Sequence, residues 1–440
     1  MLLAAGFFGM VSAARAKVHW VWSGAVTSET AVVKARVDKG VRQVRLVIQA
    51  RKGGAESHSP TSGFTIPDAA GIVTFSLESL QPGTQYQYWI EVEGTREMTG
   101  GFGTFSAGAF SFKVAFGSCA STGSNHRVFS RIRQANPDLF IHLGDFHYEN
   151  IAKNDPERFR DAFDKVLSSP RQAELYRSVP VAYIWDDHDY GPNNSDRTSP
   201  SRPAALATYQ QVVPHYPLTG EPGRAESIQQ AFSIGRVLFI MTDGRSFRSP
   251  ETDPDGPGKT MLGADQVVWF KTRLATAVEE DYALIAWVNS VPWITWENKK
   301  AEDGWESYSR ERTELADYFK QLGITSRMVV LSGDAHMVAM DDGSYSNYAS
   351  DRKAGEKAFP VVHSAPLDRY PSTKGGPYSK GTVAGWNLLW LKKEQRFTTM
   401  EIQDDGNALT VFFQGFDGSG RPLERMQMVM HCSEHVCEAE

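Results

Sequence analysis

Four short segments of the chain combine the residue types that hold metal ions. They are FGSCAS at 116–121, GDFHYEN at 144–150, WDDHD at 185–189 and SGDAH at 332–336. Each follows an apolar, β-rich run, and side chains at the carboxyl ends of strands gather at one edge of an α/β sheet. If the segments converge, they predict a hydrolytic site with two metal ions, in which the cations polarise the substrate and activate water.

The segment GDFHYEN offers a carboxylate and a phenol. Asp145 ends the apolar run LFIHLG, where its carboxylate could bridge two cations. Tyr148 lies three residues later, and a single turn would bring its phenol to the same metal. A phenolate suits trivalent iron better than zinc or magnesium. The alternative for Tyr148 is packing beside the strand end, and the residue taken alone favours that alternative.

The segments WDDHD and SGDAH add carboxylates and imidazoles. Four consecutive ionisable residues after the run VAYIW are costly to bury without a cation, although a solvated acidic loop is the alternative. One Asp of WDDHD should ligate a metal, and His188 could contact the substrate or carry protons. Asp334 and His336 are two residues apart, so an extended backbone would point both to the same side.

The chain has three cysteines. Cys432 and Cys437 lie close together near the C-terminus, where they could form a small disulfide or remain an unbridged thiol pair. Cys119 is left over inside the first segment, as a metal ligand, a reactive thiol or a small buried hydrophobe. With Tyr148 and His336 it would form a sulfur, oxygen and nitrogen donor set unlike the usual zinc and calcium sites.

Length and composition fit a globular protein of two domains, with three as the alternative. The chain has 440 residues, 41% hydrophobic and 22% charged, with a net charge of −6. It contains no Lys/Arg block, so no nucleic-acid-binding patch is expected. No apolar run reaches the roughly 18 residues that a transmembrane span requires. We expect a monomer.

The N-terminal residues predict export. Residues 1–16, MLLAAGFFGMVSAARA, join an apolar stretch to the small-x-small sequence Ala14-Arg15-Ala16, which is typical of a secretory signal peptide cut after Ala16. The stretch lacks a basic n-region, and a buried N-terminal strand or helix is the alternative. Export would place the mature chain in the periplasm or outside the cell.

The remaining sequence divides into an all-β part and an α/β part. Residues 17–107 contain strand-like runs, and the alternating apolar residues of 80–94 resemble the tyrosine-corner stretch of immunoglobulin and fibronectin III sandwiches. From residue 108 to 440, short apolar runs typical of buried strands alternate with helical patterns. Helices are expected within 125–137, 156–167, 263–278 and 309–323, and strands return after residue 385.

The four segments together resemble the calcineurin-like metallophosphoesterases, whose motifs are D-x-H, GD, GNH(D/E) and GHxH. They are more similar still to the PhoD-type alkaline phosphatases and phosphodiesterases, which carry a cysteine in the first motif and then GDxxY, WDDH and GDxH. The resemblance covers about 111–430. It implies a four-layer α+β catalytic domain, a β-sandwich flanked by helices, at 108–440. The immunoglobulin-like or fibronectin III-like sandwich at 17–107 would precede it.

The resemblance also implies the metals. Cys119, Tyr148 and His336 would hold a ferric ion, and GDxxY is shared with purple acid phosphatases, where the tyrosine binds ferric iron. Asp145 would bridge this ion to a second metal, which is calcium in PhoD-type enzymes.

The second metal and the substrate would take further residues. Asp187 and Asp334 would ligate calcium, and their carboxylates suit a hard cation. Asn289, in the run VNSVP, lies near the position of the family's VxxH histidine and would be a further ligand. His188 matches the histidine that contacts phosphate and assists the leaving group.

Three other residues are substrate-binding candidates, each with an alternative. Arg245 lies in a segment similar to a D-x-R stretch of the family and could bind phosphate or form a salt bridge to Asp243. Asn193 and Asn194 could donate hydrogen bonds to a phosphoryl group or serve ordinary turn roles.

The predicted function is hydrolysis of phosphate monoesters, diesters or both, by attack of a metal-bound hydroxide at a binuclear iron and calcium site. A phospholipase D-like phosphodiesterase is the alternative with the same chemistry. A non-catalytic phosphate-binding or surface-binding protein is the alternative from another class.

Overall fold

The computed structural model describes residues 17–52, 55–57, 63–220, 223, 225–295, 303–384, 393–433 and 436–440. The signal peptide predicted at 1–16 and most of the strand segment expected just after residue 385 lie outside this part of the chain. Among the described residues, no helix is both long enough and apolar enough to cross a membrane.

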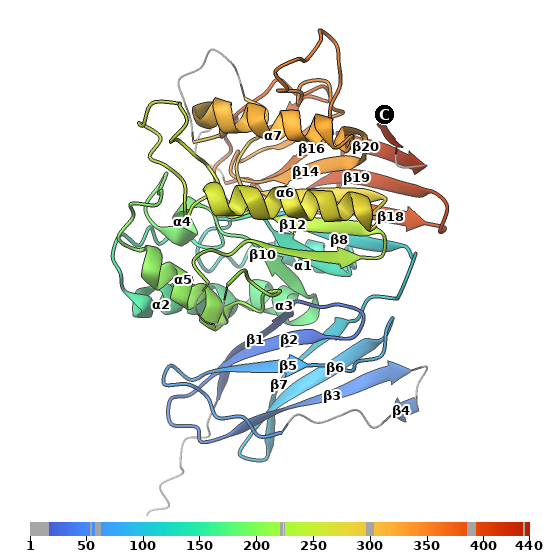
Figure 1. Ribbon diagram of the computed structural model, residues 1–440. Helices are drawn as coiled ribbons and strands as arrows, with labels where there is room; N and C mark the ends of the chain where they lie inside the picture. Colours follow the sequence, from blue (N-terminus) through green and yellow to red (C-terminus); the bar gives the residue numbers. More distant parts are fainter. Residues whose placement is uncertain are drawn as a thin grey trace, which may run out of the picture.

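The largest sheet has ten strands and combines the two ends of the chain with its middle (Figure 1). In spatial order these are β21 (Val436–Ala439), β20 (Pro422–Ser433), β19 (Leu409–Asp417), β18 (Arg396–Asp404), β8 (Phe112–Gly117), β9 (Leu139–His142), β10 (Val181–Tyr183), β1 (Val18–Gly24), β2 (Ala31–Val37) and β5 (Ile72–Leu77). The central strands β8, β9 and β10 are parallel neighbours, so their carboxyl ends lie at the same edge.

A second sheet has seven strands and packs against the first. Its order is β11 (Gln230–Ile234), β12 (Val237–Met241), β13 (Leu284–Asn289), β14 (Met328–Ser332), β16 (Val361–Ser364), β15 (Val338–Asp341) and β17 (Thr382–Val383). Side chains of β12 alternate between two hydrophobic clusters: Val237, Phe239 and Met241 join the ten-stranded sheet, whereas Leu238 and Ile240 face away from it. Both faces are therefore buried, as expected for strands with continuous apolar runs.

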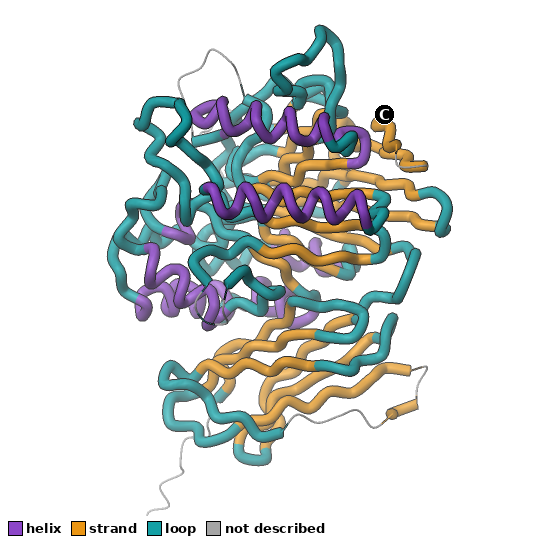
Figure 2. Tube along the Cα trace, in the orientation of Figure 1, coloured by secondary structure: helices purple, strands orange, loops and turns teal. Residues whose placement is uncertain are grey.

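Helices cover the outer faces of the two sheets. Figure 2 shows them in purple on either side of the stacked strands. α6 (Ala264–Glu279) and α7 (Ser309–Gln321) share the hydrophobic cluster on the far face of the seven-stranded sheet. α1 (Arg127–Gln134), α2 (Pro156–Leu167), α3 (Pro170–Ser178) and α5 (Arg202–Val212) lie along the ten-stranded sheet, and α4 (Asp187–Tyr190) and two 3₁₀ turns (Trp305–Tyr308 and Thr325–Arg327) complete the set. All four expected helices are present, and the layered α/β fold is confirmed.

The described residues from Val18 to Gly103 form strands and no helix. A four-stranded sheet of β4 (Ala55–Ser57), β3 (Val44–Lys52), β6 (Gln85–Val92) and β7 (Thr95–Gly103) is one layer, and β1, β2 and β5 are the other. The Tyr86 hydroxyl accepts a hydrogen bond from Gln81 N–H at 2.8 Å, the contact that defines a tyrosine corner. However, β1 also pairs with β10 at Gly24 and Val181, so this layer continues into the larger sheet. A domain division at residue 107 stays a prediction.

Polar contacts join the N-terminal strands to the helices that follow. The Lys34 ammonium, on β2, donates to the carbonyl oxygens of Gln210 and Gln211 in the last turn of α5, at 2.6 and 2.9 Å. The indole of Trp20 donates to Asp164 of α2 at 2.7 Å. The ammonium of Lys34 is almost fully buried, and burial lowers its pKa to about 8, although Asp68 opposes this shift.

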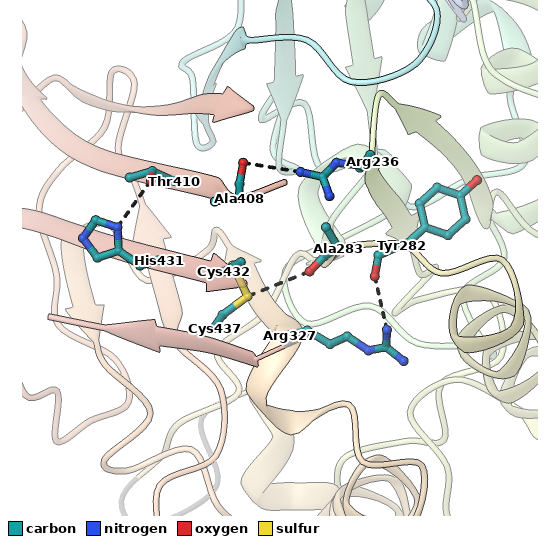
Figure 3. The surroundings of a disulfide bond; sticks show 9 residues. All are labelled: Arg236, Tyr282, Ala283, Arg327, Ala408, Thr410, His431, Cys432 and Cys437. Atoms are coloured by element: carbon teal, nitrogen blue, oxygen red, sulfur yellow. Dashed lines mark hydrogen bonds between the residues drawn. A yellow bond between two sulfur atoms is a disulfide. The ribbon is translucent and has the colours of Figure 1, made fainter. Parts of the chain in front are cut away.

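A disulfide lies at the C-terminal edge of the ten-stranded sheet. Cys432 of β20 and Cys437 of β21 are bonded, which decides between the two alternatives for this pair (Figure 3). The sulfur of Cys437 lies 3.9 Å from the carbonyl oxygen of Ala283, directly before β13. The β20–β21 hairpin therefore contacts the seven-stranded sheet as well as its own.

Candidate metal centre

The predicted metal ligands follow five parallel strands that end at the same place. Cys119 follows β8, Asp145 follows β9 and Asp187 follows β10, in the ten-stranded sheet. Asn289 is the last residue of β13, and Asp334 follows its neighbour β14 in the other sheet. Because the two sheets pack face to face, their carboxyl edges bring all four motif segments together.

The loops after these strands contact each other through their backbones. Cys119 N–H donates to the carbonyl oxygen of Gly144 at 3.2 Å, and Gly333 N–H donates to Ser290 at 3.0 Å. A Cβ on Gly333 would lie 2.7 Å from Ser118 Oγ and 2.8 Å from the carbonyl oxygen of Leu143. Glycine is therefore required in SGDAH, since this is where the two sheet edges meet.

Four of the predicted ligands have backbones in the left-handed region, where side chains other than glycine are disfavoured. The φ angles are +64° for Cys119, +56° for Asp145, +57° for Asp334 and +49° for His336. Each such conformation costs on the order of 1–3 kcal/mol, and residues of this kind cluster at functional sites. The backbone of these four residues is therefore strained, and contacts elsewhere in the structure must offset that strain.

One group of donors matches the set expected for iron. Ligand atoms of Cys119, Asp145 and His336 all lie within 4.8 Å of one another. The Tyr148 hydroxyl donates to Asp145 Oδ2 at 2.5 Å and lies 3.0 Å from His336 Nε2. A thiol, a phenol, an imidazole and a carboxylate therefore converge from three different strand ends.

A second group shares Asp145 with the first. Ligand atoms of Asp145, Asp187 and His188 also lie within 4.8 Å of one another. Asp334 Oδ1 accepts from Lys374 at 2.7 Å, and Asn289 Nδ2 donates to the carbonyl oxygen of Val291 at 2.8 Å. These residues offer oxygen and nitrogen donors, which suit a harder cation than thiolate does.

Several oxygen atoms of the candidate metal ligands are buried without a hydrogen-bond partner in the described part of the chain. They are Asp145 Oδ1, Asp334 Oδ2 and Asn289 Oδ1. A buried polar atom is costly unless it is paired or coordinates a cation. These three atoms are therefore candidates for metal coordination, and Asp145 is the residue that both donor groups share.

Burial and the neighbouring carboxylates disfavour the anionic forms of three of these candidate ligands. Burial, followed by Asp187 and Asp186, raises the pKa of Asp145 well above its usual value. Burial, followed by Asp145 and Asp334, likewise raises the pKa of the Cys119 thiol. Burial and then Asp145 raise the pKa of Tyr148. A cation among these groups would lower all three pKa values, because it favours the anionic form of each.

The family model of the PhoD-like phosphatases matches residues 114–411. The chain belongs to this family. As a PhoD-like phosphatase it is a phosphoric ester hydrolase, and its hydrolysis of phosphoesters depends on metal ions. The resemblance recognised in the four segments is confirmed. No curated protein matches the chain in sequence.

Two solved structures share the fold of this PhoD-like phosphatase. The structure of PhoD has a TM-score of 0.73 at 17% identity, over 96% of this chain and 91% of that one. A purple acid phosphatase isolated from yellow lupin (Lupinus luteus) seeds has a TM-score of 0.60 at 13% identity, over 94% and 74%. At these identities the likeness shows the fold, and the roles of individual residues rest on the geometry of this chain.

His188 of the PhoD-like phosphatase is oriented by a residue that the sequence did not single out. Its Nδ1 lies 2.5 Å from Asn150 Oδ1, while Asn150 Nδ2 donates to the carbonyl oxygen of Tyr148 at 3.3 Å. Because the amide oxygen can only accept, Nδ1 carries the proton and Nε2 is left for the site. The imidazole also packs against the Tyr148 ring, with 4.1 Å between the ring centroids and an angle of 36° between the ring planes. Burial lowers the pKa of His188, although Asp187 opposes this shift.

Arg245 does not occupy the predicted phosphate-binding position. Its guanidinium is fully buried, donates to Asp186 Oδ1 at 2.7 Å and forms an ion pair with Asp303 at 2.7 Å. The alternative, a side-chain salt bridge to Asp243, is also absent among the described contacts, where Asp243 accepts from the backbone N–H of Arg245. Burial works against its charge, but Asp186 and Asp303 raise the pKa of Arg245 above its usual value. Arg245 therefore stabilises the WDDHD loop through its contact with Asp186.

Asn193 and Asn194 lie in an exposed turn after WDDHD. The backbone N–H of Asn194 donates to Asp187 Oδ2 at 2.6 Å, and the Asn193 side chain donates to Asn194 Oδ1 at 2.7 Å. Asn194 therefore holds one oxygen of a predicted metal ligand. A contact of either side chain with a phosphoryl group stays a prediction.

The structure adds two cationic residues that the motifs do not contain. The Arg369 guanidinium lies 3.7 Å from the centroid of the Tyr148 ring, and Lys374 contacts Asp334. Both belong to the segment 366–376, which follows β16 and lies directly on the motif loops. Asp368 N–H donates to the carbonyl oxygen of Cys119 at 3.1 Å. The only sequence signal for these residues is their charge in a polar, glycine-rich loop.

Proposed function

We propose that this PhoD-like phosphatase hydrolyses phosphate esters at a binuclear centre. Cys119, Tyr148 and His336 would hold a ferric ion. Asp145 would bridge it to a calcium ion held by Asp187 and Asp334, with Asn289 as a further ligand. The observation that carries the proposal is the position of Asp145, which belongs to both donor groups and has one buried oxygen without a hydrogen-bond partner among the described residues.

Metal ions bound by these residues would supply Lewis-acid stabilisation of the phosphoryl oxygens and would acidify water. The chain's own residues divide the remaining work. His188, with Nδ1–H held by Asn150, would act as the imidazolium: it would give its Nε2 proton to the leaving-group oxygen and remain as the neutral ring with its proton on Nδ1. Arg369, held against the Tyr148 ring, would contribute a fixed positive charge beside the substrate.

We also propose that the mature chain is exported as a monomer to the periplasm or the extracellular space. The disulfide between Cys432 and Cys437 supports this, because disulfides persist in oxidising compartments. The apolar stretch at 1–16 with its small-x-small site supports it independently.

The direct test is turnover with metal analysis. Metal-replete protein is assayed on nitrophenyl phosphate and on the bis-ester, with iron and calcium measured in the same samples. We expect hydrolysis that chelation abolishes and that both metals together restore. Activity on neither ester would refute the catalytic proposal, and activity on the bis-ester alone would favour the phospholipase D-like alternative. Full activity with zinc as the only metal would refute the metal assignment.

A matched pair of variants locates the site. Cys119→Ala removes a predicted iron ligand, and we expect the iron content and the activity to fall together. Cys432→Ala removes a cysteine outside the site and should leave the iron content unchanged. Equal iron content in all three proteins would exclude Cys119 as a ligand.

A further inference from the structure

The segment 366–376 places a lysine at the side of the proposed calcium site. Lys374 Nζ donates to Asp334 Oδ1 at 2.7 Å, and the Asp334 side chain is only 6% exposed. Asp334 Oδ2 is buried with no hydrogen-bond partner in the described residues. The lysine therefore occupies one oxygen of this carboxylate and leaves the other for a cation.

The fold fixes the position of this lysine on both sides. Before it, Ser372 N–H donates to the carbonyl oxygen of His336 at 3.3 Å, and Ser372 Oγ donates to Ala335 at 3.1 Å. After it, Gly376 N–H donates to the carbonyl oxygen of Ile294 at 3.1 Å. A Cβ on Gly375 would lie 2.3 Å from that same oxygen. The backbone around Lys374 is therefore anchored directly to the SGDAH loop.

The ammonium group keeps hydrogen-bonding capacity for a ligand. It has three N–H donors, and among the described residues Asp334 accepts from it. The Lys374 side chain is 30% exposed, so a molecule in the site can reach it.

We propose that Lys374 is a specificity-determining residue that favours phosphomonoester dianions over phosphodiester monoanions, an inference that rests on the proposed function. A monoester has one more charged terminal oxygen than a diester. That oxygen can accept from Lys374 while the others face the metal ions, whereas a diester carries an ester group at this position. The fixed cation therefore contributes to binding of the monoester and contributes little to binding of the diester.

The test compares two esters with the same leaving group, nitrophenyl phosphate and methyl nitrophenyl phosphate, at alkaline pH. Lys374→Met should lower kcat/KM for the monoester by about 10–100-fold, the effect of losing a hydrogen bond to a charged group, and change the diester much less. Lys374→Arg should keep most of the preference. Lys353→Met, at an exposed turn, removes the same charge elsewhere and should change neither value. Equal losses on both esters would overturn the proposal.

Measuring ligand affinity tests the role of Lys374 independently of whether the protein is catalytically active. Inorganic phosphate and dimethyl phosphate are titrated calorimetrically into metal-replete wild type and Lys374→Met, whose metal content is measured. Weaker binding of phosphate alone supports the role of Lys374 even if the wild type cleaves neither ester, a result that would refute only the proposed function. Unchanged phosphate affinity overturns the role. Loss of metal from Lys374→Met, with full recovery on added metal, would assign the lysine to Asp334 alone and would also overturn it.

Discussion

Asn150 gives a sharp test of how His188 works. The amide oxygen of Asn150 lies 2.5 Å from His188 Nδ1 and fixes the proton on that nitrogen. Asn150→Ala removes this acceptor, so that the ring can rotate and the imidazolium, whose Nδ1–H donates to the amide oxygen, becomes less favoured. If His188 gives its Nε2 proton to the leaving group, the variant should lose rate in proportion to how much the leaving group needs that proton.

The structure sets the size of this effect. A hydrogen bond to a group that becomes charged contributes about 1.5–3 kcal/mol, which corresponds to roughly 10–150-fold in rate. Asn150 is exposed, so water can partly replace its oxygen, and the lower end of the range applies. We therefore expect about a tenfold loss of kcat with an alkyl or phenyl leaving group. With nitrophenol, a good leaving group, we expect almost no loss.

The assay measures kcat and KM for an alkyl, a phenyl and a nitrophenyl phosphate. Asn150→Asp keeps an acceptor and should retain most of the activity. Asn136→Ala is the matched control, because Asn136 is also exposed and has a φ of +51°, against +50° at Asn150. An equal loss on all three esters would show that Asn150 acts on metal binding or folding, and the proton-donor role of His188 would then be wrong.

Three further perturbations test the metal centre and the layers that support it. Tyr148→Phe should abolish or shift the visible charge-transfer band expected of a phenolate on ferric iron; an unchanged absorption spectrum would exclude Tyr148 as a ligand. Arg245→Met leaves Asp186 and Asp303 short of a partner and should lower the free energy of unfolding by about 3–5 kcal/mol in denaturant titrations; a loss below about 1 kcal/mol would contradict this. Lys34 has a pKa of about 8 in the folded state against 10.5 for an ordinary lysine, so the unfolded chain binds more protons between these pH values and stability should rise with pH there. Relative to Lys34→Met, the wild type should gain about 3 kcal/mol across this window, and parallel stability curves would refute the shift.

The sequence was sufficient to predict that the candidate metal ligands lie close together, because the signals are local. Each motif follows a run of buried apolar residues, and a strand that ends in Asp, Cys or His places that residue at a sheet edge. Cys119, Asp145 and His336 converge as predicted. The helix α5 was not expected, because its buried face uses the small residues Ala204 and Ala205. In α3 the buried Gln172 similarly breaks the apolar periodicity.

The position of the segment 366–376 could not be predicted from sequence patterns of this kind. Its polar and glycine-rich sequence has no period, and its position depends on backbone hydrogen bonds to loops more than 200 residues earlier, such as Leu367 N–H to Ser118 at 2.8 Å. Arg369 and Lys374 are thus placed by tertiary contacts alone. The same limit explains Arg245, for which the similarity to a D-x-R segment of the family implied a phosphate contact, with a salt bridge to Asp243 as the alternative. Burial beside two carboxylates gives it an internal partner instead.

In the motif WDDHD, the two outer aspartates hold the loop in place and the two central residues face the other candidate ligands. Of its four ionisable residues, Asp187 and His188 belong to the donor group around Asp145. Asp186 pairs with Arg245, and Asp189 accepts from the backbone N–H groups of His147 and Asp186 at 2.9 and 3.1 Å. The flanking residues therefore fix the loop that carries the central pair. Because Asp189 also holds His147 of GDFHYEN, the same contact sets the distance between the two motifs. A change at Asp189 should therefore disturb both donor groups, although Asp189 belongs to neither of them.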